Sequence, residues 1–142
     1  RIKITITFKF MFAVTKIQEP IHLYYISKHP FPAGISRAWA ELERHITKRS
    51  GLKFYGIFDG QQYLASCDNP RSVSILRESL QEYVIPVGKY LTHTIHDWQD
   101  NKEHIALTFQ EMEAVLLCDN ASADIEFYKS NRELICLKAL KK

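Results

Sequence analysis

The sequence has little glycine, proline or cysteine: five, five and three residues in a chain of 142. With 46% hydrophobic and 25% charged residues, this composition excludes a disordered or collagen-like chain and is typical of a globular domain. No apolar run approaches the ~20 residues that span a bilayer, and lysine and threonine interrupt the apolar residues of the N-terminal segment, unlike in a signal peptide. We therefore expect one domain over residues 1–142 with no membrane partner.

Motifs for catalysis and cofactor binding are also missing. The cysteines Cys67, Cys118 and Cys136 are odd in number and form no C-x-x-C, so neither a disulfide framework nor a zinc site is indicated, and a reducing, cytoplasmic location fits best. The sequence contains no Walker loop, no G-x-G-x-x-G and no G-x-S-x-G. His93 and His96, the closest histidine pair, would point to opposite sides of a strand. We predict no cofactor, no metal site and no catalytic residue.

Charge of one sign is not concentrated along the chain. There are 19 basic and 16 acidic residues, which give a net charge of +3, and the one basic cluster is the tail of Lys138, Lys141 and Lys142. A dedicated nucleic-acid binder gathers its positive charge on one face. We therefore expect no direct nucleic-acid binding by this domain.

Hydrophobic periodicity predicts an α+β fold with an antiparallel sheet and two main helices. Apolar residues at every even position from Ile2 to Val14 predict a long strand with one buried face. Apolar spacings of three and four predict helices at 37–49 and at about 101–118, the second with a stripe that ends at Leu116. The other predicted strands cover residues 21–27, 53–58, 63–67, 82–95 with a break at Pro86 and Gly88, 124–128 and 133–140, and an Asp59-Gly60 turn joins the second and third of these.

The order of elements is similar in the two halves of the chain. Residues 55–67 match residues 125–136 in pattern, because each segment has an aromatic residue, a polar turn and an apolar strand that ends near a cysteine. In this match Gly56 corresponds to Glu126, and Phe58 corresponds to Tyr128. Internal repeats of this kind predict two similar half-domains, about 1–81 and 82–142, around a pseudo-twofold axis with a ligand cleft between them.

Aromatic residues make up 12% of the chain, and one carboxylate lies among them. Glu126 is inside the apolar segment Ile125–Tyr128, where a carboxylate is costly unless it is paired or solvated. A carboxylate surrounded by aromatic rings suits an organic cation, through charge pairing and cation–π contact. Two alternatives stay open: the aromatic residues only fill a core, or Glu126 points to solvent from an edge strand.

Several segments resemble the gyrase-inhibitor-like effector-binding domain family, which includes the C-terminal domains of multidrug-sensing and right-origin-binding transcription activators. One is Ile85–Tyr90 (IPVGKY), which precedes an alternating strand, and another is Asp124–Tyr128 (DIEFY), which precedes a short turn and a terminal strand with a basic end. Ala38–Leu42 and Tyr55–Phe58 add to the likeness, which covers nearly the whole chain. The proline usual in the family's last strand is missing, which leaves the role of Glu133 open.

The resemblance implies a duplicated βαββ fold whose central cleft binds bulky apolar or cationic small molecules. It also implies the residues that contact the ligand, which are Glu126 and, around it, Trp39, Tyr55, Phe58, Tyr90 and Tyr128. Members of the family occur as sensor domains attached to a helix-turn-helix domain and as free-standing proteins. The absence of a methionine before Arg1 leads us to expect the first kind.

We therefore predict a non-catalytic small-molecule sensor, the effector-binding part of a bacterial transcription regulator, which contacts DNA only through an attached helix-turn-helix domain. The alternative is a free-standing hydrolase of reactive electrophilic small molecules, as some relatives are implied to be, with Glu126 orienting water. A third interpretation is a protein–protein adaptor that uses the edge of strand 2–14.

Overall fold

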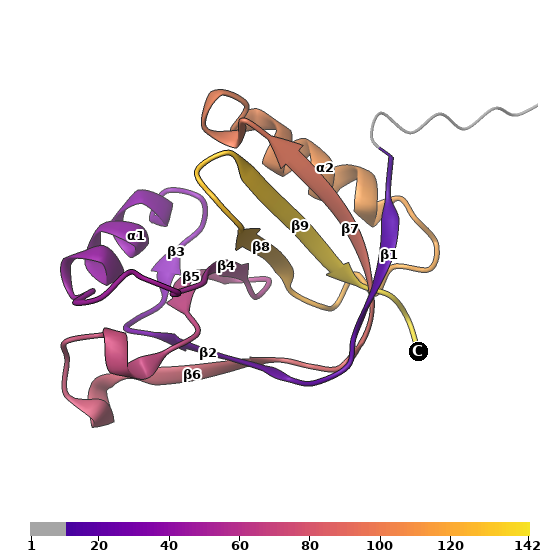
Figure 1. Cartoon of the computed structure of the whole chain (residues 1–142). Helices are drawn as coiled ribbons and strands as arrows, with labels where there is room; N and C mark the ends of the chain where they lie inside the picture. The colour runs from indigo at the N-terminus through magenta and orange to yellow at the C-terminus, as the bar shows by residue number, and fades with distance from the viewer. Residues whose placement is uncertain (1–10) are drawn as a thin grey trace, which may run out of the picture.

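The computed structural model describes residues 11–142, and the strands of this part of the chain form a curled antiparallel sheet with two helices, an α+β fold (Figure 1). The strands are β1 (Ala13–Ile17), β2 (Ile21–Tyr25), β3 (His29–Pro30), β4 (Phe54–Phe58), β5 (Gln62–Cys67), β6 (Gln81–Ile85), β7 (Gly88–His96), β8 (Asp124–Tyr128) and β9 (Glu133–Ala139). The α-helices are α1 (Ile35–Arg44) and α2 (Glu103–Glu113), and short 3-10 helices cover Pro70–Ser72, Arg77–Ser79 and Trp98–Asp100.

Two long arms of the chain curl the sheet into a half-barrel. The strand order is β1-β7-β9-β8-β4-β5-β2-β6, with β3 paired to β5. The first arm is β1 followed by β2, the second is β6 followed by β7, and they pair with each other on both sides of a bend. Ile17 lies opposite Gly88 before the bend and Ile21 lies opposite Ile85 after it. Figure 1 shows the two arms turning together beside the C-terminus.

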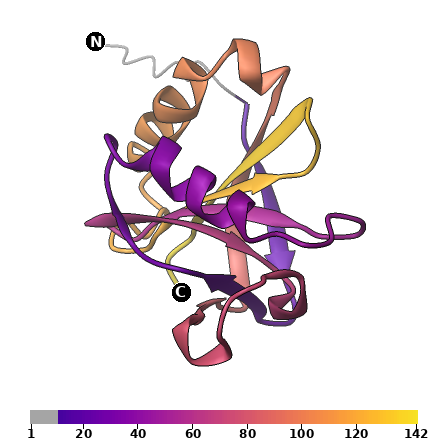
Figure 2. The same cartoon turned by 90° about the vertical axis from the view of Figure 1, so that its left-hand side faces the viewer.

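Side-chain alternation gives the sheet an outer face, which the helices cover, and an inner face inside the curl. On the outer face, Leu42 of α1 packs against β5, and Phe109 of α2 packs in one cluster with Leu134 of β9. Figure 2, seen from the side of α1, shows this helix in front of the sheet. A separate apolar cluster lies on the inner face and includes Tyr55 and Ile125. The successive residues of β8 therefore face two different environments.

Most predicted strands are confirmed to within a few residues. The break predicted at Pro86 and Gly88 separates β6 from β7, and the predicted turn at Asp59-Gly60 joins β4 to β5. Gly60 has a φ of 101°, a conformation that glycine adopts without the steric cost of a side chain. None of the helices in residues 11–142 combines the length and apolarity needed to cross a membrane.

Both helices end earlier than their apolar spacing predicts. The first ends at Arg44 instead of residue 49, because Ile46 leaves the helix and forms an isolated β-bridge with Val73. The second ends at Glu113, and Leu116, the last residue of its predicted stripe, is 88% exposed. Apolar residues just beyond a helix can keep its spacing by chance, so spacing alone sets a boundary poorly.

The predicted strand 2–14 lies mostly outside the described residues. In the described part, β1 begins only at Ala13 and continues to Ile17. The expectation of a buried even-numbered face is wrong at Val14, which is 59% exposed. Val14 lies on the outer face, and β1 is at the edge of the described sheet, where β7 is its one partner among the described strands.

Candidate functional site

Glu126 lies at the centre of the outer face. Its strand β8 is flanked by β9 and β4, so its Cα partners are Cys136 on one side and Gly56 on the other. The residue is only 8% exposed. The alternative that Glu126 points to solvent from an edge strand is therefore wrong.

Two tyrosine hydroxyls donate hydrogen bonds to the same carboxylate oxygen of Glu126. The Tyr63 hydroxyl is 2.6 Å from Oε1, and the Tyr128 hydroxyl is 2.9 Å from it. The indole N–H of Trp39 donates to the Tyr63 hydroxyl at 3.0 Å. Because hydrogen bonds in a chain polarise one another, the indole makes Tyr63 a stronger donor to the carboxylate.

The second carboxylate oxygen of Glu126, Oε2, accepts no hydrogen bond from the described residues. In this part of the chain, every side-chain oxygen or nitrogen that is fully buried has a hydrogen-bond partner. Since Oε2 lacks one, it is not fully buried, and it accounts for part of the small exposure of Glu126. The carboxylate is thus held at one oxygen and open at the other.

Gly56 provides the space into which the carboxylate and Tyr63 extend. A Cβ atom at position 56 would collide with the Tyr63 hydroxyl and with Oε1 of Glu126. The next residue across the sheet from Gly56 is Ala65, which is also small. Glycine in the middle of a strand often marks such a close approach.

Tyr128 lies between two tryptophans. Trp39 of α1 and Trp98, in the 3-10 helix after β7, each place a ring centroid 5.0 Å from the Tyr128 ring, with an interplanar angle of 75°. The Trp98 indole N–H donates to the backbone oxygen of Ser130 at 3.1 Å. The two indoles thus add aromatic surface around a tyrosine that binds Glu126, and the faces of aromatic rings attract cations.

Burial raises the pKa of the Glu126 carboxyl above its ordinary value. The hydrogen bonds from Tyr63 and Tyr128 act in the opposite direction, and Asp124 raises the pKa further. The pKa values of the two tyrosines are also raised, first by burial and then by the charge of Glu126. Both hydroxyls therefore keep their protons and remain donors at physiological pH.

The structure brings three of the six residues named for ligand contact together: Glu126, Trp39 and Tyr128. Phe58 is also on the outer face but stacks on Phe31, with ring centroids 4.0 Å apart. Tyr63 was missed by the sequence argument, although a hairpin places it opposite Phe58 and therefore on the same face. Trp98 was missed as well, because it lies outside every periodic segment.

Tyr55 and Tyr90 are not brought to Glu126. Both lie on the inner face, because Tyr55 differs from Gly56 by one position in β4 and the side chains of a strand alternate. Tyr55 stacks on Phe127 with centroids 4.7 Å apart, and the Tyr90 hydroxyl donates to the backbone oxygen of Pro86 at 2.7 Å.

The three cysteines lie in the interior of the domain. Cys67, Cys118 and Cys136 are free and buried, and burial raises the pKa of each thiol. A thiol with a raised pKa is a poor nucleophile at neutral pH, because the thiolate is the reactive form.

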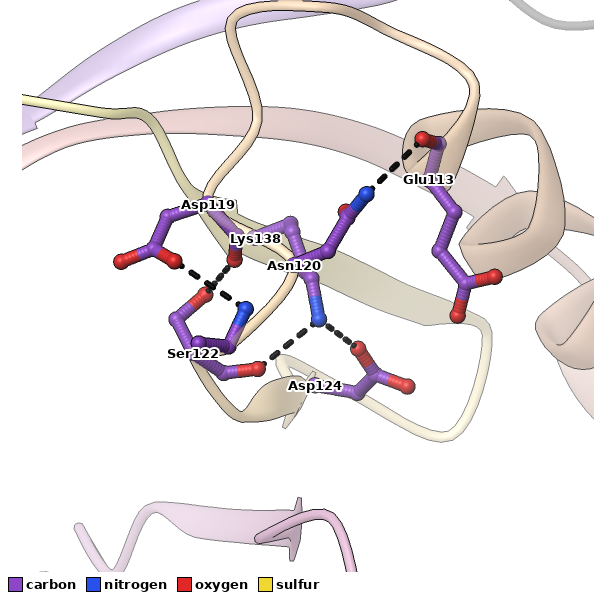
Figure 3. Close-up of polar contacts among 7 residues, drawn as sticks. Glu113, Asp119, Asn120, Ser122, Asp124 and Lys138 are labelled. Carbon is purple, nitrogen blue, oxygen red and sulfur yellow. Dashed lines mark hydrogen bonds and ion pairs between the residues drawn. The ribbon is translucent and has the colours of Figure 1, made fainter.

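Lys138, the first lysine of the basic C-terminal tail, is buried. Lys138 is 3% exposed, with Nζ 2.7 Å from Oδ1 of Asp124 and donating to the backbone oxygen of Ser122 at 2.8 Å (Figure 3). Figure 3 also shows Asn120 of the same loop donating to the backbone oxygen of Glu113, the last residue of α2. The buried lysine therefore fixes the connection between α2 and β8.

Comparison with known proteins gives a structural neighbour but no family. No family model matches the chain, and no curated protein matches it. Among solved structures, the chain is similar to an integron cassette protein from the mobile metagenome of Vibrio cholerae, with a TM-score of 0.72 and 15% sequence identity. The match covers 94% of this chain and 97% of that chain. At this identity the likeness shows the fold alone.

Proposed function

We propose that this domain is a non-catalytic sensor that binds a hydrophobic organic cation at Glu126, as the effector-binding part of a bacterial transcription regulator of the gyrase-inhibitor-like family. The observation that carries the proposal is the state of the Glu126 carboxylate. It is nine-tenths buried, two tyrosines donate hydrogen bonds to Oε1, and none of the residues 11–142 donates one to Oε2. A buried carboxylate with one open oxygen is a ready partner for a positive charge.

The balance of energies supports an organic cation over an inorganic one. A charge pair about 4 Å apart at an effective dielectric of about 20 is worth about 4 kcal/mol before desolvation, which offsets part of this gain. Each cation–π contact adds about 0.5 to 2 kcal/mol. The rings of Trp39, Tyr128 and Trp98 contribute less per contact, but they favour a cation that carries apolar surface.

We further propose that the fold is duplicated around a pseudo-twofold axis, with half-domains of about 1–81 and 82–142. The strand pairing supports this: β5 pairs with the second strand of the first arm, and β9 pairs with the second strand of the second arm. The central strands β4 and β8 pair at Gly56 and Glu126, the two residues that correspond in the sequence repeat. Equivalent residues that face each other lie on the axis. A glycine in one half and a glutamate in the other would leave one carboxylate there, enough for one cation.

The hydrolase alternative is favoured by one observation. The raised pKa of Glu126 brings the carboxyl closer to the pH at which a general base is most effective. Turnover of an epoxide by the wild-type domain, lost in Glu126→Gln, would support the hydrolase. Binding without turnover supports the sensor.

Two ions of the same shape and opposite charge provide the test of the cation site. Tetraphenylphosphonium should quench tryptophan fluorescence on binding, because Trp39 and Trp98 both lie at the site, whereas tetraphenylborate should bind far more weakly. Glu126→Gln should weaken the cation by about tenfold or more, and Glu113→Gln, at an exposed glutamate of α2, should change nothing. Equal binding of both ions, or full affinity in Glu126→Gln, would contradict the cation site.

The regulator part of the proposal has its own test. The reading frame upstream of Arg1 in the native gene should encode a helix-turn-helix domain. A start codon directly before Arg1 would contradict the proposal of a transcription regulator. The cation site would still be tested by the tetraphenylphosphonium titration.

A further inference from the structure

The inner face of the half-barrel contains a cavity that the Glu126 site does not use. Its volume is about 320 Å³, at the small end of the range of small-molecule sites. Ile17, Ile21 and Ile85, the residues beside the bend of the two arms, line one end of it. The cavity therefore lies between the arms and the central strands, on the side of the sheet opposite to α1 and α2.

The cavity has one wall of hydroxyl groups and one apolar wall. Thr15 of β1 and Thr92 and Thr94 of β7 form the first wall. The second is formed by Phe127, Ile135 and Leu137 of β8 and β9, and Tyr55 reaches the cavity with its ring stacked on Phe127. No charged side chain is among the lining residues of the described chain. Such a lining disfavours a charged ligand, which would lose its hydration without gaining an ionic partner.

Within the described residues, two of these three threonine hydroxyls make no hydrogen bond. The Thr92 hydroxyl donates to the backbone oxygen of Ala13 at 3.4 Å, a long hydrogen bond. The hydroxyls of Thr15 and Thr94 have no hydrogen-bond partner within residues 11–142. A ligand in the cavity can therefore exchange hydrogen bonds with them in addition to its apolar contacts.

We propose that this cavity is a second small-molecule site, which takes a compact neutral molecule with an aromatic or aliphatic body and one hydroxyl, amine or carbonyl group. The apolar body lies on the wall of Phe127, Ile135 and Leu137, and the polar group faces Thr94 and Thr15. The two faces of β8 then contact ligands of different charge: Glu126 binds a cation on the outer face, and Phe127 contacts a neutral molecule on the inner face. The inference goes beyond the proposed function and does not depend on it.

The neutral probe N-phenyl-1-naphthylamine tests the site in the unaltered protein. Its fluorescence should rise on binding. In a spectrum of isotope-labelled isoleucine methyl groups, the signals of Ile17, Ile21, Ile85 and Ile135 should shift during the titration. The signals of Ile95 and Ile105, which belong to the cluster around α2, should stay in place. No binding up to the solubility of the probe, or shifts confined to Ile95 and Ile105, would overturn the proposal.

Substitutions at Thr94 separate shape from hydrogen bonding. Thr94→Phe fills the cavity and should weaken the probe by at least about tenfold, whereas Thr94→Val keeps the shape and should weaken it by about threefold. Thr94→Phe should leave tetraphenylphosphonium binding unchanged, and Glu126→Gln should leave the neutral probe unchanged. This crossed design distinguishes failure of the inner site from failure of the cation site. Equal loss of the neutral probe in Glu126→Gln would show that both probes share the outer site and overturn the inference.

Discussion

Gly56 and Glu126 face each other across β4 and β8, and the space that a side chain on Gly56 would need is occupied by the Glu126 carboxylate and the Tyr63 hydroxyl. The position of the Glu126 carboxylate thus depends on the absence of a side chain at Gly56. This dependence can be measured directly.

Gly56→Ala should destabilise the domain by about 1 to 3 kcal/mol, as overpacking of a filled site does, and should weaken cation binding. Urea unfolding measures the first effect and a tetraphenylphosphonium titration the second. In a Tyr63→Phe background the added methyl group no longer meets the Tyr63 hydroxyl, so Gly56→Ala should lower the free energy of unfolding by less. Additive effects in the double variant would contradict a collision between a side chain at position 56 and the Tyr63 hydroxyl.

Removal of a tyrosine hydroxyl should raise the pKa of Glu126 further, because each hydroxyl stabilises the ionised carboxylate. Tyr63→Phe should have the larger effect, since its hydrogen bond is the shorter one and Trp39 strengthens it. Titration of the Glu126 carboxyl carbon by NMR gives the pKa of Glu126 in wild type, Tyr63→Phe and Tyr128→Phe. A pKa that falls in either variant would show that the hydroxyl is not a donor to the charged form.

Cation binding should depend on pH through Glu126. Protons and cations compete for the same carboxylate, so the affinity for tetraphenylphosphonium should rise as the pH passes through the raised pKa of Glu126 and level off above it. The affinity of Glu126→Gln should be weak and independent of pH over the same range. A wild-type affinity that falls with rising pH would contradict a role for the ionised carboxylate.

Folding stability should show the opposite pH trend. The folded pKa of Glu126 is raised, so its favourable contribution to stability is complete below the pKa of an unfolded glutamate, about 4.3, and is lost as the pH rises through the folded value. Glu126→Gln should therefore be more stable than wild type at pH 8, with no such gain at pH 4. Each pH unit between the folded and unfolded pKa corresponds to about 1.4 kcal/mol. Thermal unfolding of both proteins at the two pH values measures the difference, and an equal gain at both would rule out ionisation as its cause.

The buried ion pair of Lys138 and Asp124 should be far more important for stability than an exposed one. Asp124→Ala leaves a buried ammonium group without its carboxylate, which typically costs about 3 to 5 kcal/mol. Glu43→Ala breaks the Arg49–Glu43 pair, whose side chains are more than half exposed, and should change stability little. Urea unfolding compares the two variants, and similar effects would mean that Lys138 finds another partner.

The sequence predicts the strands well because alternation and turn residues are local signals. Both arms break at prolines, and the Asp59-Gly60 turn is a two-residue signature, so these boundaries need no knowledge of the rest of the molecule. The residues at which the helices end depend instead on contacts with distant parts of the chain. Ile46 has helical spacing from Leu42, and its place is set by Val73, a partner 27 positions further along the chain.

Part of the site could also have been derived from the sequence. Tyr55 and Phe58 are three positions apart in one strand, so their side chains cannot lie on the same face of the sheet. Glu126 corresponds to Gly56 in the sequence repeat, and Gly56 is two positions from Phe58, so Glu126 is expected on the face of Phe58. The same hairpin then adds Tyr63 to that face. Trp98 could not be found in this way, because the 3-10 helix that holds it is placed by the turn at Asp97, which has a φ of 51°.

In each arm, a strand from one half of the chain pairs with a strand from the other half. This pairing has a consequence for how the domain unfolds. Within residues 11–142, β1 pairs only with β7 of the second half, and β6 pairs only with β2 of the first. Neither half by itself keeps all its strands paired, although β4 and β5 can form a hairpin early. A ribosome-bound chain that ends before β6 exposes both edges of a partial sheet to other nascent chains. We therefore expect the two halves to fold and unfold as one cooperative unit.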